Sequence, residues 1–453
     1  LQHSYDGLKQ THGTHVMGSA VGGDSRYRGI APKADVVVVG NVLSDNYKQL
    51  DSLQQQKLER TPGYKIDEFR YMFEQADKQG KPCVINMSAG SRQSFGDDFP
   101  VYNYLISELC GPGKIIVASA GNNGQQLVTL HKPDGKESVG SRAIITSSPL
   151  CYLFFQKKGD VECQLLYSET EGGEKKIVPD SLYEAIDTIS DYDGSFVRYY
   201  ILQHEKMEGK GTFFYARLTG SGEGSLYTQG VKYENSGVDD GFNDAIYDYS
   251  VNFPGCYDDV ICVGGTDHRN DIVNYECRQL HVNNGEIGRN YVHTSVGPRL
   301  DGYQKPDISA PSSCIISSYS SFYEENNPNA GDLGWDSERF EHNGRTYAWN
   351  ANAGTSMAAP IVTGVIALWL QANPNLTPQD IKDIFKRTAR HPDPTFPYPN
   401  AIYGYGEIDA YAGLLDILGI DKIEGISKDH ARNVKFVIKD GEVKAYDKQT
   451  NEP

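Results

Sequence analysis

The sequence predicts an α/β protein whose parallel sheet is interrupted by a separate all-β module. In the first 144 residues, apolar strand-like runs alternate with helical stretches. That alternation is typical of βαβ units, in which helices cover a parallel sheet. From about residue 145 to 245 the helical pattern stops, and β-rich runs follow one another between glycine-rich or charged turns. This second pattern is typical of an all-β unit of the jelly-roll kind.

Five elements are expected before the module. In chain order they are strand 35–39, helix 66–79, strand 83–87, helix 99–110 and strand 114–119. The strand runs are continuously apolar and rich in β-branched residues, which favours strands buried on both faces of a parallel sheet.

The module is expected to contain the β runs 144–157, 161–168, 196–204, 211–218 and 226–233. The run Gly220–Gly224 could suggest phosphate binding, but it lacks a lysine and a following helix, so a hairpin turn is the better interpretation. Beyond residue 420, the runs 434–438 and 442–446 predict a second hairpin. The expected division is therefore 1–144 and 246–420 for the α/β part, 145–245 for the inserted module and 421–453 for a C-terminal hairpin extension.

One run, Gly354-Thr355-Ser356-Met357-Ala358-Ala359-Pro360, carries the strongest functional signal. Its small residues suit a sharp turn into the apolar helix that follows, with the hydroxyl group of Ser356 exposed. A lone Gly-x-Ser would indicate only a helix cap. The whole run is far more specific than that, so Ser356 is more than a helix cap.

Two further runs supply possible partners for Ser356. Thr11-His12-Gly13-Thr14-His15 places two histidines, His12 and His15, close to the N-terminus. We interpret His15 as a packed residue, because no glutamate follows in an HExxH arrangement. Asn122 lies in a Gly-Asn-Asn-Gly turn after strand 114–119, and by itself it would be only a turn former.

Together these runs resemble the histidine, oxyanion and nucleophile signatures of subtilisin-like serine proteases. Segments 27–34, 294–298, 305–311 and 403–409 resemble further landmarks of that family in the same order. The resemblance covers most of 1–145 and 245–420. It implies a three-layer subtilisin-like fold and a serine endopeptidase, in which His12 accepts the proton of Ser356 and Asn122 helps to hold the oxyanion. The inserted β module resembles, in layout only, that of the clostridial spore-germination proteases.

The resemblance also implies where a substrate lies. A peptide should add as an extra strand beside the end of strand 83–87. The walls of the first specificity pocket would come from two short segments of small residues, which suggests a roomy pocket. These wall residues are Ser88, Ala89, Gly90, Ser119, Ala120 and Gly121.

The catalytic aspartate of the family ends a strand well upstream of the histidine, whereas His12 is preceded by only eleven residues. Asp6 follows no strand and is interpreted as a loop residue. The resemblance therefore places the aspartate upstream of this chain, on an N-terminal segment or a second polypeptide, and suggests a processed or truncated piece. The alternative is a pseudoprotease that binds peptides or signals without cutting. The absent aspartate favours it, and intact Ser356, His12 and Asn122 oppose it.

Composition narrows the class of partners. The chain has 43 Lys and Arg against 60 Asp and Glu, a formal charge of −17 that argues against nucleic acid. No membrane span is expected, because no stretch reaches the ~18 apolar residues that one requires. Leu1 is not an initiator methionine and no signal peptide is visible, while the family resemblance implies a secreted or cell-envelope protein.

No cofactor is expected, and no metal after the histidine helix, because Gly22–Arg26 is too short to wrap a calcium ion that needs ~6–8 oxygens. Cys83, Cys262 and Cys314 lie in apolar runs and are interpreted as buried thiols. Cys151 and Cys163 flank an expected hairpin and could pair in an oxidising compartment.

Overall fold

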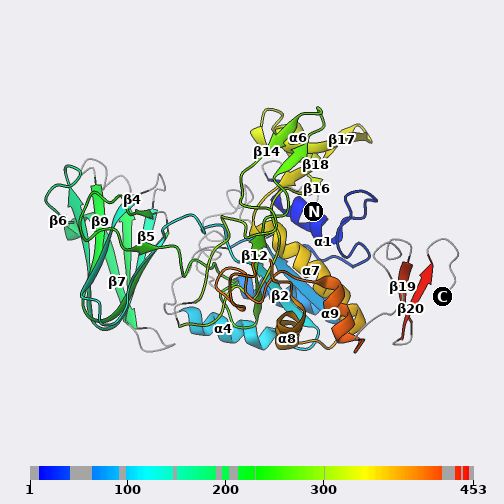
Figure 1. Ribbon diagram of the computed structural model, residues 1–453, viewed down its shortest axis with the longest axis horizontal. Helices are drawn as coiled ribbons and strands as arrows, with labels where there is room; N and C mark the ends of the chain where they lie inside the picture. Colours follow the sequence, from blue (N-terminus) through cyan, green and yellow to red (C-terminus); the bar gives the residue numbers. More distant parts are fainter. Residues whose placement is uncertain are drawn as a thin grey trace, which may run out of the picture.

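A computed structural model of the protein describes residues 10–40, 64–90, 98–145, 150–189, 196–203, 213–229, 231–299, 301–420, 434–439 and 442–447. In Figure 1 an α/β body occupies the centre, an all-β unit extends to its left, and a two-stranded hairpin lies to its right. That hairpin pairs β19 (Val434–Lys439) with β20 (Glu442–Asp447), as the sequence predicts.

The central sheet is parallel and has the order β1-β2-β12-β15. Its strands are β1 (Cys83–Met87), β2 (Lys114–Ser119), β12 (Val260–Thr266) and β15 (Ile308–Pro311). β1 and β2 have the predicted bounds. All seven residues of β12 are buried, which is the expected property of an inner strand covered on both faces.

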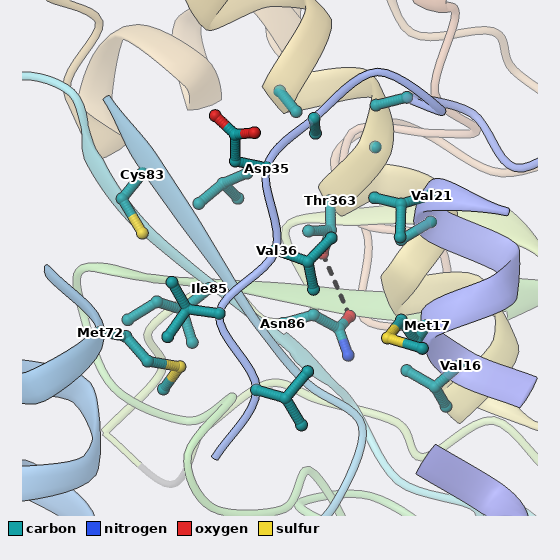
Figure 2. Close-up of a pocket in the computed structure, with 18 of the residues that line it drawn as sticks. Val16, Met17, Val21, Asp35, Val36, Met72, Cys83, Ile85, Asn86 and Thr363 are labelled. Carbon is teal, nitrogen blue, oxygen red and sulfur yellow. Dashed lines mark hydrogen bonds between the residues drawn. The ribbon is translucent and has the colours of Figure 1, made fainter. Parts of the chain in front are cut away.

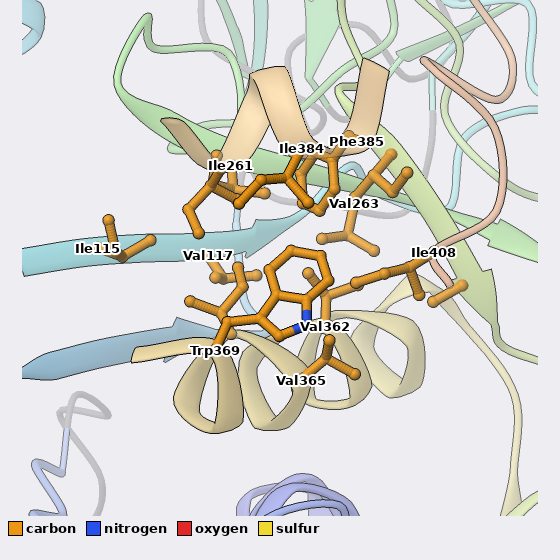
Figure 3. Packing of buried hydrophobic residues seen from close by; sticks show 14 of the residues in the cluster. Ile115, Val117, Ile261, Val263, Val362, Val365, Trp369, Ile384, Phe385 and Ile408 are labelled. Carbon is orange, nitrogen blue, oxygen red and sulfur yellow. The ribbon is translucent and has the colours of Figure 1, made fainter. Parts of the chain in front are cut away.

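Helices cover both faces of this sheet, so the body has three layers. On one face lies α7 (Thr355–Ala372), supported by α8 (Pro378–Thr388) and α9 (Ala410–Ile417). Figure 3 shows Trp369 of α7 among Val117, Ile261 and Val263 of the sheet and Phe385 of α8. α3 (Tyr64–Asp77) and α4 (Asp98–Leu109) cover the other face through a second cluster that includes Ile106 and Ile116.

Helix α7 is the one described helix with the length and apolarity of a membrane span, contrary to the expectation that no stretch is apolar enough. Within the fold, 67% of that apolar window is buried. Its composition therefore matches that of a central core helix.

The predicted strand 35–39 is not a strand in the structure. Residues 35–40 belong to no helix or strand, and Val36 and Val38 are 49% and 72% exposed. A strand needs a neighbour for its N–H and C=O groups, and among the described residues none pairs with this segment. β1 likewise pairs only with β2 there, so its other edge is open.

The all-β unit is a nine-stranded antiparallel sheet. Its strands are β3 (Thr129–Lys132), β4 (Ser138–Ile145), β5 (Leu150–Ser168), β6 (Lys176–Ile177), β7 (Tyr183–Ile189), β8 (Phe196–Gln203), β9 (Phe213–Gln229), β10 (Val231–Glu234) and β11 (Ala245–Ile246). β3 and β4 join this sheet ahead of the boundary expected at residue 145. The base of the unit is a pairing of β3 with β11, in which Leu130 lies opposite Ala245.

Two expected turns of this unit are wrong. β5 and β9 are long, uninterrupted strands paired along their length, and Gly220–Gly224 lies inside β9. Gly220 and Gly222 have φ of +106° and +103°, and a Cβ at Gly222 would lie 2.2 Å from the carbonyl oxygen of Lys158. The glycines thus allow the strand pair to continue through a conformation that other residues rarely adopt. Cys151 and Cys163 consequently lie on one strand, and both are free thiols.

A small three-stranded sheet, β16 (Ile315–Tyr319), β18 (Arg345–Asn352) and β17 (Asp336–His342), lies above the body in Figure 1. The short helices α6 (Ser321–Asn326) and η3 (Gly331–Trp335) accompany it. The strand pair β13 (Asp271–Val273) and β14 (Gln279–His281) is separate. β16 packs against α1 (His12–Val21), which also contacts α7.

Candidate active site

Ser356 is the second residue of α7, in the turn that the sequence predicts. Gly354, just before the helix, has φ of +141°, and a Cβ there would lie 3.2 Å from Asn122 Nδ2. The half-buried Ser356 donates a hydrogen bond from Oγ to the carbonyl oxygen of Ser88 at 3.1 Å. The Ser88 hydroxyl in turn donates to the carbonyl oxygen of Ser356 at 2.7 Å. The start of α7 is therefore fastened to the end of β1.

Asn122 lies beside the same turn. Its Oδ1 accepts hydrogen bonds from the N–H and the hydroxyl of Thr355, at 2.9 and 3.0 Å. Thr355 Oγ1 also accepts from the N–H of Gly121, at 3.2 Å. Because Oδ1 is engaged twice, the amide orientation is fixed, and Nδ2 finds no acceptor among the described residues. An exposed N–H donor next to Ser356 can therefore stabilise a negative oxygen.

His12 is the first residue of α1. Its side chain is exposed at the surface, yet the surrounding protein desolvates it enough to lower its pKa below 6.5. Among the described residues, no hydrogen bond joins it to Ser356 and no carboxylate pairs with it. The structure thus bonds Ser88 to Ser356 and Asn122 to Thr355, the residue before Ser356. Among the described residues, it leaves His12 without a hydrogen-bonded partner.

His15, one turn further along α1, is fully buried. Its Nε2–H lies 3.0 Å from the carbonyl oxygens of both Ile315 and Asn350. Burial lowers the pKa of His15 to about 4, so the ring is neutral near pH 7. This environment agrees with the predicted packed role.

The predicted pocket walls differ in exposure. Ser119 and Ala120 are buried, with 5% and 0% of their surface exposed, whereas Ala89 and Gly90 are exposed. Both walls end against one segment: a Cβ at Gly90 would lie 2.2 Å from Phe253 O, and one at Gly121 would lie 2.5 Å from Asn252 Nδ2.

Asn252 is held in place by Asn123, whose Nδ2 donates to its Oδ1 at 3.3 Å, and Ser295 accepts from the N–H of Asn123. The sequence analysis missed Asn252 and Phe253, because no motif marks them. Ser295 lies in the landmark segment 294–298, but nothing in that segment indicated a contact with Asn123.

A cavity of about 1970 Å³, hereafter the β1 cavity, lies along the open edge of β1. Figure 2 shows side chains from several elements around it, among them Met17 of α1, Ile85 of β1, Met72 of α3, Thr363 of α7 and Val36. His12, Ser88 and Ala89 line its end. The cavity is larger than the ~300–1,000 Å³ typical of small-molecule pockets, and its lining includes every residue of β1.

No group of three or more His, Cys, Asp or Glu side chains is placed to hold a metal ion in the part of the chain that the structure describes. Burial raises the pKa of the Cys83 thiol, at the far end of β1, to about 11. A thiol with so high a pKa is a poor nucleophile, so Ser356 is the better candidate for covalent chemistry at this site.

Comparison with known proteins places this geometry in a family. The sequence profile of the subtilase family, Peptidase_S8, matches residues 2–147 and 235–406, leaving the centre of the all-β unit unmatched. The serine protease AprX of Bacillus subtilis (strain 168) is 38% identical over 119 residues, which are 26% of this chain and 23% of AprX. Bacillopeptidase F of the same organism is 36% identical over 133 residues, 28% of this chain and 8% of that protein. The chain thus matches less than a quarter of the length of either relative.

Among solved structures, the CspB protease of Clostridium perfringens is similar with a TM-score of 0.61 at 19% identity, over 90% of this chain and 80% of that chain. This similarity concerns the fold, which is the α/β fold with a parallel sheet that the sequence predicts. The family profile spans more than half of the residues, and its match includes the segments that carry His12, Asn122 and Ser356. The chain belongs to the subtilase family.

Proposed function

We propose that the protein is a serine endopeptidase with Ser356 as its nucleophile. Ser356 Oγ attacks a peptide carbonyl carbon while His12 takes the hydroxyl proton. The resulting oxyanion accepts hydrogen bonds from Asn122 Nδ2 and the N–H of Ser356. The C–N bond then breaks as His12 returns the proton to the amine, and water releases the acyl group. The observation that carries this proposal is the double hydrogen bond from Thr355 to Asn122, which aims an amide N–H beside the nucleophile.

The N–H of Ser356 suits the second donor role for a structural reason. It lies in the first turn of α7, where helix N–H groups have no acceptor within the helix. The positive end of the helix dipole is also there, and it stabilises a developing negative charge. Both donors are fixed before substrate arrives, which is the condition for efficient transition-state stabilisation.

The substrate class we propose is extended polypeptide, bound as a strand beside residues 88–90. The substrate side chain that enters the first specificity pocket would lie between Ser88–Gly90 and Ser119–Gly121. The exposure of Ala89 and Gly90 leaves their main-chain groups open to such pairing. The secreted or cell-envelope location remains a proposal that rests on the family alone.

We further propose that the β1 cavity is occupied in the active protein by an extended segment that brings the catalytic aspartate to His12. Among the described residues β1 pairs only with β2 and residues 36–39 pair with no strand, so each would gain a strand partner. The added segment would also cover four large apolar side chains that line the cavity and are otherwise exposed. They are Met17, Val36, Val38 and Leu368. An N-terminal segment or a second polypeptide would serve equally.

Val38→Asp tests this occupancy. Val38 is 72% exposed, so a carboxylate there costs little if the cavity is empty, but it would be buried against an added strand. We expect Val38→Asp to reduce activity and thermal stability of the active protein. Val273→Asp, at a position 60% exposed on β13, is the control and should change neither. Equal behaviour of the two variants would contradict the proposal.

The competing function is a pseudoprotease that binds peptides without cutting them. One observation favours it: Ser356 Oγ donates to Ser88 rather than to His12. Reaction with a fluorophosphonate probe separates the two, because only an activated serine is labelled. We expect labelling and peptide hydrolysis by the unaltered protein and neither by Ser356→Ala, whose fold should be intact. Turnover by Ser356→Ala within tenfold of the unaltered protein would exclude Ser356 as the nucleophile.

A further inference from the structure

Four ionisable residues lie close together in the small sheet above α1. Glu324 of α6 is 6% exposed and Asp336 of β17 is 0% exposed, and both face Arg339. Asp332 of η3 accepts hydrogen bonds from the hydroxyls of Tyr319 and Tyr323 at 2.5 and 3.1 Å. We name Glu324, Asp332, Asp336 and Arg339 the acid cluster.

The single guanidinium of the acid cluster is unequally shared. Arg339 Nε and Nη2 both lie 2.6 Å from Asp336 Oδ2, whereas Glu324 Oε2 is 3.7 Å from Nη2. Glu324 Oε1 is buried and has no hydrogen-bond partner. A buried carboxylate without donors is costly when ionised. Glu324 is therefore the member of the cluster that is least stable in its charged form.

The pKa of Glu324 reflects its burial and its nearby charges. Burial, followed by the negative charge of Asp336, raises the pKa of Glu324 to about 7, against a lowering by Arg339 and a further increase from Asp332. Burial also raises the pKa of Asp336, which Asn350 and Arg339 lower. As the pH rises through about 7, Glu324 therefore loses its proton and the acid cluster gains a negative charge.

Two hydrogen-bonded routes connect the acid cluster to the start of α1. In the first, the N–H of Glu324 donates to Ser320 O, and the N–H of Ser320 donates to Thr11 Oγ1, both at close to 3 Å. Thr11 is the residue before His12. In the second, Asn350 Nδ2 donates to Asp336 Oδ1 at 2.8 Å, and Asn350 O accepts from His15 Nε2 at 3.0 Å.

We propose that the acid cluster positions the start of α1, and with it His12, and that Glu324 makes this positioning respond to pH. The inference rests on the proposed function, because His12 is the base of that reaction. With Glu324 neutral, one guanidinium balances Asp336 and α6 stays packed. With Glu324 ionised, repulsion from Asp336 and Asp332 loosens α6, and the Ser320–Thr11 contact that holds α1 is weakened. Glu324 is thus a positioning residue and touches no substrate.

The test compares two neighbouring charges on one short helix. Glu324→Gln keeps the shape of the side chain and stays neutral at every pH. Glu325→Gln removes the same charge from an exposed residue that pairs with Arg345 at 2.8 Å. We expect kcat of the unaltered protein and of Glu325→Gln to fall about tenfold from pH 7 to pH 8.5, as one proton is lost, and Glu324→Gln to show no such fall. KM should not change with any of these substitutions.

A third variant separates positioning from local stability. Thr11→Val removes the acceptor for Ser320 at nearly constant volume. We expect the fall in kcat above pH 7 to become shallower, while the pH dependence of thermal stability that Glu324 causes remains. A Glu324→Gln profile equal to that of the unaltered protein, or loss of the fall in Glu325→Gln, would overturn the proposal.

The ring-proton NMR signal of His12 gives a readout that does not need catalysis. In the unaltered protein and Glu325→Gln it should shift a second time near pH 7, above the titration of His12 itself, and Glu324→Gln should lack that second shift. If no variant reacts with fluorophosphonate or cuts peptides, the proposed function fails, and this signal alone decides the positioning. Absence of the second shift in the unaltered protein would refute it.

Discussion

Asn122 and Thr355 are joined through a single oxygen atom, because Oδ1 of Asn122 accepts both the N–H and the hydroxyl of Thr355. Turning the amide over would break both hydrogen bonds and place N–H groups against N–H and O–H donors. The orientation of Nδ2 is therefore determined by the residue that precedes Ser356. The donor Nδ2 of Asn122 can therefore be removed without removing the hydrogen bonds that Oδ1 accepts from Thr355.

Asn122→Asp should remove the donor and keep the acceptor. We expect kcat to fall about 10²–10³-fold, the size known for loss of one oxyanion donor in subtilisin, with little change in KM. Thermal unfolding should move little, because Oδ1 can still accept from Thr355. Asn123→Asp is the matched control: its Nδ2 supports Asn252, so it should raise KM and lower stability instead. Equal kcat losses in both variants would argue against an oxyanion role.

His15 should make stability depend on pH on the acidic side. Its pKa is lowered from 6.5 to about 4, so the unfolded chain binds a proton that the folded protein rejects. The stabilisation that neutral His15 contributes is therefore fully present above pH 6.5. The free energy of unfolding falls as the pH drops toward 4, by roughly 3 kcal/mol in all. Urea titrations between pH 4 and 7 measure this slope. His15→Gln keeps an N–H donor without titrating, and it should flatten the slope. An unchanged slope would assign the effect to other groups.

The β5–β9 strand pair of the all-β unit should tolerate no side chain at Gly222. Gly222→Ala adds a contact of 2.2 Å with Lys158 O to the strain of a positive φ, so both must relax at a cost of several kcal/mol. Gly237→Ala, where φ is +72° and nothing lies within 4 Å, should cost only about 1–2 kcal/mol of backbone strain. The denaturant concentrations at which the two variants are half unfolded measure their losses of stability. Equal losses would show that strain alone, without the clash, sets the requirement for glycine.

Removal of the all-β unit should change which substrates are cut. The unit leaves the body just after the oxyanion segment and returns just before Asn252, and β3 pairs with β11 at its base. A short turn from residue 132 to 244 should therefore close the gap. We expect the rate on large proteins to rise relative to the rate on short peptides, if the unit shades the site. An unchanged ratio of the two rates would refute a role in access.

The sequence was informative where local pattern and burial agree. β1 and β2 are continuous apolar runs that pair with each other in the parallel sheet, so their bounds were predicted correctly. Val36–Val39 has the same composition, but strand formation depends on a neighbour that no local pattern reveals. The turn expected at Gly220–Gly224 is wrong because glycine with positive φ occurs both in turns and, as here, within paired strands. The motifs predicted Ser356 beside Asn122, whereas the Asn252 wall is formed by contacts between distant segments.

The open edge of β1 has a consequence for handling the protein. Among the described residues no strand pairs with the outer edge of Cys83–Met87, and this strand lacks the charges, bulges and prolines that protect natural sheet edges. Any extended apolar chain can pair there, including an unfolded copy of the same protein. A preparation in which this edge stays uncovered should therefore aggregate through intermolecular strand pairing, and at a rate that rises steeply with concentration. Solubility would then report whether the edge is covered, independently of any assay of activity.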